Sequence, residues 1–123
     1  MKNEDKVSVV IGASPNLRRY SNAAVLRLSE AGYTVYPIGI RNGAINGIQI
    51  IKGMPNIKDV HTVTLYISAI HQPQYYDYII KLKPKRLIFN PGTYNPEFKE
   101  MSIKAGISVI SDCTLVMISM GLY

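Results

Sequence analysis

The sequence predicts an α/β protein built on a doubly wound, mostly parallel sheet of about five strands, with helices on both faces. Three observations carry this prediction. Short apolar runs, typical of strands buried on both faces, recur along the 123 residues. Segments with helical periodicity separate several of these runs, as crossover helices do in parallel sheets. Glycine or proline stands at most of the boundaries between them.

The first third of the chain predicts one complete strand–helix–strand unit. Residues 7–11 form an apolar run that ends at Gly12. Ser21 is expected to cap a helix over residues 22–31, which a glycine then closes. Residues 34–38 predict a second strand, parallel to the first and reached by a right-handed crossover.

The rest of the chain resumes the alternation after an irregular stretch. Glycine and proline punctuate residues 39–60, which predict only one short strand, at 48–51. Pro73 suits the first turn of a later helix, and Asn95 with Pro96 suits the start of another. The remaining predicted elements are strands at 62–67, 86–90 and 107–110 and a terminal helix at 114–120.

Composition indicates one globular domain over residues 1–123. Hydrophobic residues make up 47% and charged residues 18%, which is ordinary for a folded protein. No apolar run approaches the roughly 20 residues of a membrane helix, and the N-terminus does not resemble a signal peptide. We therefore expect a cytoplasmic protein with no membrane partner. The single cysteine, Cys113, excludes an internal disulfide and predicts no metal cluster.

The formal net charge of +6 points to an anionic partner. Nucleic acid is one candidate, but the basic residues are scattered, and the densest cluster, at 81–86, fits a solvated helix end and loop. An anionic small molecule fits the charge without requiring a basic face. The sequence leaves open whether the chain forms a homo-oligomer or binds another protein.

The loops after the strands are the expected binding region, because ligands of doubly wound sheets bind beyond the carboxyl ends of the strands. The first such loop, residues 12–21, carries Ser14, Arg19 and Ser21 at the start of a helix, where free N–H groups attract anions. Its single glycine, Gly12, falls short of the usual G-x-G-x-x-G pattern. An arginine fork can hold a phosphate across that gap, so the loop predicts a phosphate site, with a plain turn as the alternative.

Three other loops follow strands in the same way. The loop at 67–72 carries the polar residues Ser68, His71 and Gln72. Arg41 follows the second strand, and the run Asn90-Pro91-Gly92 follows a later one, where a binding role and a simple turn are equally good interpretations. We interpret His61 and His71 as surface or loop residues, since no acid–nucleophile pattern stands beside them. No catalytic residue and no metal ligand is predicted.

These segments resemble the CoA-binding protein family, which consists of small single-domain Rossmann-like proteins similar to the N-terminal domain of the succinyl-CoA synthetase α subunit. The likeness covers nearly the whole chain, although glycine and isoleucine stand at 39–40 where the family often has a proline-containing pair. The matching segments are G-A-S-P-x-x-x-R-x-S-N at 12–22, G-Y-x-V-x-P at 32–37, Gly47, N-P-G at 90–92, Asn95 and Cys113.

The resemblance implies a role for each matching residue. Gly12, Ala13 and Ser14 would face a pyrophosphate, and Arg19 and Ser21 would contact phosphate oxygens. Arg41 would lie beside a 2′- or 3′-phosphorylated ribose. The other members of the implied site, from the matching segments at 12–22 and 90–92, are Asn22, Asn90, Pro91 and Gly92.

Two functions are compatible with this pattern. The first is non-catalytic binding of coenzyme A or an acyl-CoA, and the sequence favours it over an enzyme. The alternative is an NADP-linked or acyl-CoA-processing enzyme component that needs a partner subunit. Residues 37–43 contain no acid to bind the ribose of NAD, whereas Arg41 leaves NADP open.

Overall fold

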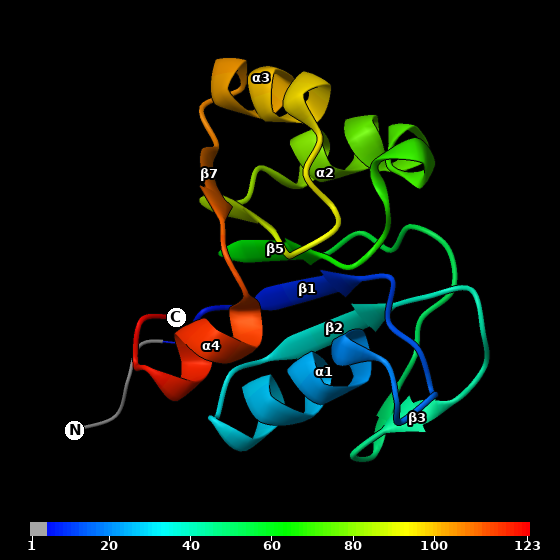
Figure 1. The fold of residues 1–123 in the computed structure, drawn as a ribbon. Coiled ribbons are helices and arrows are strands. Elements are labelled where there is room, and N and C mark those ends of the chain that lie inside the picture. The colour runs from blue at the N-terminus through cyan, green and yellow to red at the C-terminus, as the bar shows by residue number, and fades with distance from the viewer. Residues whose placement is uncertain (1–4) are drawn as a thin grey trace.

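A five-stranded parallel sheet forms the centre of the computed structural model, which describes residues 5–123 (Figure 1). Its strand order is β2-β1-β5-β6-β7, so the chain starts in the sheet, moves to one edge and then crosses to the other. The predicted doubly wound parallel sheet is thus confirmed. The strands are β1 (Ser8–Ile11), β2 (Val35–Ile38), β5 (Thr62–Leu65), β6 (Arg86–Phe89) and β7 (Ser108–Ser111).

Helices cover both faces of this sheet. In Figure 1, α1 (Tyr20–Glu30) and α4 (Thr114–Ser119) lie on one side, and α2 (Tyr76–Leu82) and α3 (Pro96–Lys104) lie on the other. Two short 3-10 helices, η1 (Ala69–His71) and η2 (Pro73–Tyr75), lead into α2. Residues 39–60 hold a small antiparallel hairpin, β3 (Ala44–Ile45) and β4 (Ile48–Gln49). Within residues 5–123, no helix is long and apolar enough to cross a membrane.

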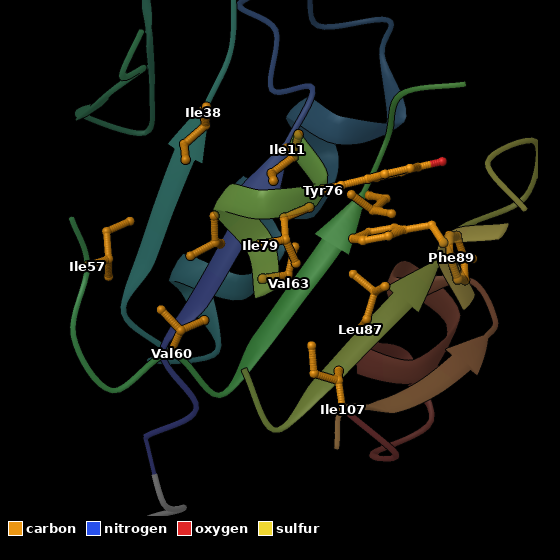
Figure 2. Packing of buried hydrophobic residues seen from close by; sticks show 13 residues of the cluster. Ile11, Ile38, Ile57, Val60, Val63, Tyr76, Ile79, Leu87, Phe89 and Ile107 are labelled. Atoms are coloured by element: carbon orange, nitrogen blue, oxygen red, sulfur yellow. The ribbon is translucent and has the colours of Figure 1, made fainter. Parts of the chain in front are cut away.

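Each face of the sheet has its own apolar core. Side chains of β1, β5 and β6 pack against α2 and α3, where Ile79 and Phe98 are fully buried (Figure 2). On the opposite face, Val25 and Leu28 of α1 and Met117 of α4 cover the alternate strand residues. Burial on both sides explains why β1 is a continuous apolar run rather than an alternating one.

Helix α1 begins earlier than the sequence predicts. The N-cap is Arg19, with extended backbone angles of φ −85° and ψ 138°, and Tyr20 is the first helical residue. Ser21 is therefore not the cap; it lies in the first turn with only 3% of its surface exposed. The prediction was wrong because it relied on the capping preference of serine, whereas the loop before the helix is held by other side chains. By contrast, the cap of α3 is confirmed, since Oδ1 of Asn95 accepts the Phe98 N–H at 3.2 Å.

Candidate functional site

A cleft of about 540 Å³ opens at the carboxyl edge of the sheet, beyond β2, β1 and β5. Its volume lies in the range of small-molecule sites, about 300–1,000 Å³. Three loops line it, one after each of these strands. Their lining residues are Gly12, Ala13, Ser14, Arg19 and Ser21; Gly39, Ile40 and Arg41; and Tyr66, Ile67, Ser68, His71, Gln74 and Tyr75.

The turn after β1 requires glycine at position 12. Gly12 has a φ of +95°, a conformation that other residues rarely adopt. A β-carbon there would lie 2.8 Å from Cγ2 of Ile67 and 3.0 Å from the carbonyl of Tyr66. The turn is tied to β2 because the N–H groups of Gly12 and Ala13 both donate to the Ile38 carbonyl at 2.9 Å.

Three side chains shape the loop between this turn and α1. The Ser14 hydroxyl oxygen accepts the Asn16 N–H at 3.1 Å, and Oδ1 of Asn16 accepts the Arg18 N–H at 2.9 Å. Nδ2 of Asn22, inside the helix, donates back to the Ser14 carbonyl at 2.9 Å. These bonds hold the loop without using the hydroxyl proton of Ser14, which stays available to a ligand.

The start of α1 gives the cleft a positive potential. No side chain caps this helix and no acid lies in its first turn, so its N-terminal N–H groups keep their attraction for anions. Arg19 and Arg41 both line the cleft and are exposed, and the guanidinium group of neither makes a hydrogen bond or an ion pair with any residue in 5–123. No aspartate or glutamate is among the lining residues. The cleft therefore favours an anion.

Gly39 lets the loops after β1 and β2 come into contact. A β-carbon at this position would lie 2.1 Å from the carbonyl oxygen of Ala13, which is backbone and cannot move aside cheaply. The Gly39 N–H donates to the Ile51 carbonyl at 3.0 Å, which fixes the loop from the other side. The structure thus gives a reason for glycine where the resembling family often has a bulkier pair.

The wall formed by residues 66–75 includes lining residues that the sequence analysis did not count among the site residues, although the loop at 67–72 was one of its candidates. Burial raises the pKa of the Tyr66 phenol, so this hydroxyl remains protonated. Ser68, His71 and Gln74 are exposed polar residues on the same wall. The sequence does place residues 67–72 directly after a predicted strand, at the carboxyl edge of the sheet. What the sequence did not reveal is that β5 lies directly beside β1.

Six of the ten predicted site residues line the cleft, and four do not. Asn22 is buried and supports the first loop. Asn90 is also buried, with its amide donating to Thr64 Oγ1 at 2.6 Å and to the Leu65 carbonyl at 2.8 Å, and its Oδ1 accepting the Thr114 N–H. Pro91 and Gly92 are exposed but lie outside the lining. Among the described residues, no group of three or more histidine, cysteine, aspartate or glutamate side chains is placed to hold a metal ion.

The strand order and the cleft beyond the first strands define a small Rossmann-like α/β domain. The chain belongs to the CoA binding domain family, which matches residues 6–119. Membership of this family supports CoA binding in general. A comparison with curated proteins gives no match.

Solved structures agree with this fold. A crystal structure of an uncharacterized protein is 44% identical, covers 98% of this chain and 100% of its own, and superposes with a TM-score of 0.95. A hypothetical protein from Pyrococcus horikoshii OT3 is 27% identical, with 97% and 84% coverage and a TM-score of 0.83. The protein called cell-free ID.343 from Thermus thermophilus, at 21% identity, 97% and 91% coverage and a TM-score of 0.84, shares the fold.

Proposed function

We propose that the protein binds coenzyme A or an acyl-CoA in this cleft and performs no chemistry on it. One observation carries the proposal. The uncapped N-terminus of α1 and two unpaired arginines, Arg19 and Arg41, meet in a cleft that no carboxylate lines. Such a site suits a ligand with several phosphates, and CoA binding in general is what membership of the family supports.

In this proposal the pyrophosphate lies against the loop between β1 and α1. Backbone N–H groups at the start of the helix and the hydroxyl of Ser14 donate to its oxygens, with Ser21 nearby in the first turn. Arg19, the residue just before the helix, adds a charged fork to the same phosphates. Gly12 and Ala13 would form the floor of the cleft beneath the pyrophosphate. Asn22 acts indirectly, by holding the Ser14 carbonyl.

The second phosphate group of CoA, on the 3′-position of its ribose, would lie beside Arg41. This arginine belongs to the loop after β2, which contacts the first loop where Gly39 meets the carbonyl of Ala13. Asn90, Pro91 and Gly92 have a different role in this proposal. They support the neighbouring strand ends through the buried amide of Asn90 and do not touch the ligand.

The lining of the cleft also supports the absence of chemistry. His71 is its only imidazole, and the lining has neither a carboxylate to orient that ring nor a thiol for it to activate. Cys113 lies outside the lining, at the N-cap of α4. A general base without an orienting group or a nucleophile is a poor start for acyl transfer.

Isothermal titration calorimetry with CoA, NADP and NAD tests the proposal. We expect CoA to bind more tightly than NAD, because the loop after β2 offers Arg41 and no acid for a free ribose. Native mass spectrometry of the purified protein provides a second measurement, with a retained CoA-sized adduct as the supporting result. NAD binding equal to or tighter than CoA binding contradicts the proposal, and a preference for NADP favours the enzyme-component alternative.

A further inference from the structure

The two edge strands of the sheet, β2 and β7, differ in how they are covered. At the β2 edge, the Ile51 N–H donates to the Pro37 carbonyl at 2.8 Å, and the Gly39 N–H donates to the Ile51 carbonyl at 3.0 Å. Pro37, inside β2, also removes one donor from that edge. At the opposite edge β7 is the last strand, and within residues 5–123 no strand pairs with its outer side (Figure 1).

The β7 strand lacks the features that usually protect an exposed edge, which are charged side chains, proline, a bulge or a covering segment. Its sequence is Ser-Val-Ile-Ser at 108–111, it pairs with β6 in unbroken register, and its residues are exposed or half-buried. The helices before and after it in the chain carry exposed apolar side chains, Ile103 on α3 and Val116 on α4. The described part of the chain thus leaves an uncharged edge open to a further strand.

The hydrogen bonds to β6 show which backbone groups of β7 are available. The N–H groups of Ser108 and Asp112 donate to carbonyls of the β6 segment, each at 3.1 Å. Because backbone groups alternate between the two sides of a strand, Ile110 also faces β6. Val109 and Ser111 therefore direct their N–H and C=O groups outward.

These outward groups complement themselves about a two-fold axis that passes through Ile110. In an antiparallel pair, two residues that both face the partner strand lie opposite each other and exchange two hydrogen bonds. With Ile110 opposite Ile110 of the second copy, Val109 lies opposite Ser111 of the second copy, and symmetry gives the reverse pair. Moving the axis one residue either way would pair outward residues with Ile107 or Cys113, whose N–H groups already donate within the chain.

We propose that the protein forms a two-fold symmetric dimer in which β7 pairs antiparallel with β7 of a second copy. The pairing places no like charges opposite each other, because Asp112 meets the uncharged Ser108 of the second copy. The axis is perpendicular to the sheet, so α3 would lie beside α3 of the second copy and α4 beside its α4. The cleft lies beyond β2, β1 and β5, so this inference does not rest on the proposed function.

Analytical ultracentrifugation over the micromolar concentration range tests the dimer. We expect the wild-type protein to sediment as a dimer. Val109→Pro removes an outward donor and no bond to β6, so the strand should persist. This variant should raise the dimer dissociation constant at least about 10-fold, because two hydrogen bonds are lost per dimer. Val109→Thr keeps the donor and the branched shape, so this control should remain a dimer.

A cysteine pair tests the register independently, in a Cys113→Ser background that removes the native thiol. Ile110→Cys would place two thiols opposite each other at the axis, where Cα atoms of a non-hydrogen-bonded pair are about 4.5 Å apart. Mild oxidation should therefore link the two copies by a disulfide. Ser108→Cys, on the same strand, is the control, because its two copies would lie about 14 Å apart along the strands and should not be linked.

The outcomes decide the proposal in either direction. A dimeric wild-type protein that Val109→Pro dissociates, with cross-linking at position 110 and not at 108, supports it. The proposal is overturned if the wild-type protein stays monomeric throughout the micromolar range, or if Val109→Pro dimerises as tightly as the wild type. Cross-linking at position 110 that is no better than at 108 also overturns it. Should circular dichroism show that Val109→Pro does not fold, the cysteine pair decides alone.

Discussion

Beyond β2, β1 and β5 several charged and polar side chains of the carboxyl edge are exposed and line an open cleft, whereas the asparagines beyond β6 are buried and hydrogen-bonded to neighbouring elements. Arg19, Arg41 and His71 belong to the first region. Asn90 and Asn95 belong to the second, where Nδ2 of Asn95 donates to Tyr76 Oη at 2.7 Å. Both regions follow strand ends and are rich in polar residues. The difference is whether the polar groups already have protein partners, because a group that is fully satisfied has little left for a ligand.

The largest effect that separates the two regions should be on stability. Asn90→Ala removes both donors to Thr64 and Leu65 and leaves the buried Thr114 N–H without its acceptor. We expect a loss of about 2–4 kcal/mol in the free energy of unfolding. Urea denaturation followed by circular dichroism measures it. The affinity of the folded variant for CoA should be nearly unchanged.

An exposed asparagine is the control for this prediction. Asn56→Ala alters a solvent-accessible side chain and should change the free energy of unfolding by no more than about 0.5 kcal/mol. If Asn90→Ala is as mild as Asn56→Ala but abolishes CoA binding, the region beyond β6 binds ligand after all and the contrast between the regions is wrong.

Of the two adjacent arginines before α1, the one that lines the cleft, Arg19, should show the next largest effect. Arg19 lines the cleft and forms the N-cap, whereas Arg18 lies outside the lining with its N–H bonded to Asn16. Arg19→Ala should weaken CoA binding by about 1.5–3 kcal/mol, the range for a charge-assisted hydrogen bond. Arg18→Ala removes an exposed charge and should cost under about 1 kcal/mol. Dissociation constants of the two variants decide the matter, and a larger loss for Arg18→Ala would mean that the loop is oriented differently.

Much of the fold could be predicted from the sequence because local signals were consistent. Apolar runs marked the strands, and Asn95-Pro96 marked the start of α3. The start of α1 was harder, since its cap geometry comes from turns made by Ser14 and Asn16 rather than from a capping side chain at Ser21.

The candidate loops could be predicted because each follows its own strand directly. The loop after β1, Arg41 and the loop at 67–72 could all be placed at the carboxyl edge from strand positions alone. That the wall at 66–75 lies beside the loop after β1 depends on β5 pairing with β1, a contact between segments about 50 residues apart that no local pattern encodes. The role of Asn90 depends on Thr114, which becomes its neighbour only when α4 packs on the sheet.

The smallest effect we expect concerns the 3′-phosphate and Arg41. Dephospho-CoA, which lacks this phosphate, should bind the wild-type protein about 1–3 kcal/mol more weakly than CoA, because one charge-assisted contact is lost. Arg41 is exposed, so water and salt screen its interaction with the phosphate, and the difference in affinity should shrink as ionic strength rises.

Arg41→Ala should weaken the binding of CoA and leave the binding of dephospho-CoA unchanged, so that the two ligands bind with equal affinity. Arg27→Ala, in the last turn of α1 and outside the cleft, should preserve the difference. Calorimetric titration of CoA and dephospho-CoA with the wild-type protein, Arg41→Ala and Arg27→Ala measures these affinities. Equal binding of CoA and dephospho-CoA to the wild-type protein would remove Arg41 from the proposed contact with the 3′-phosphate.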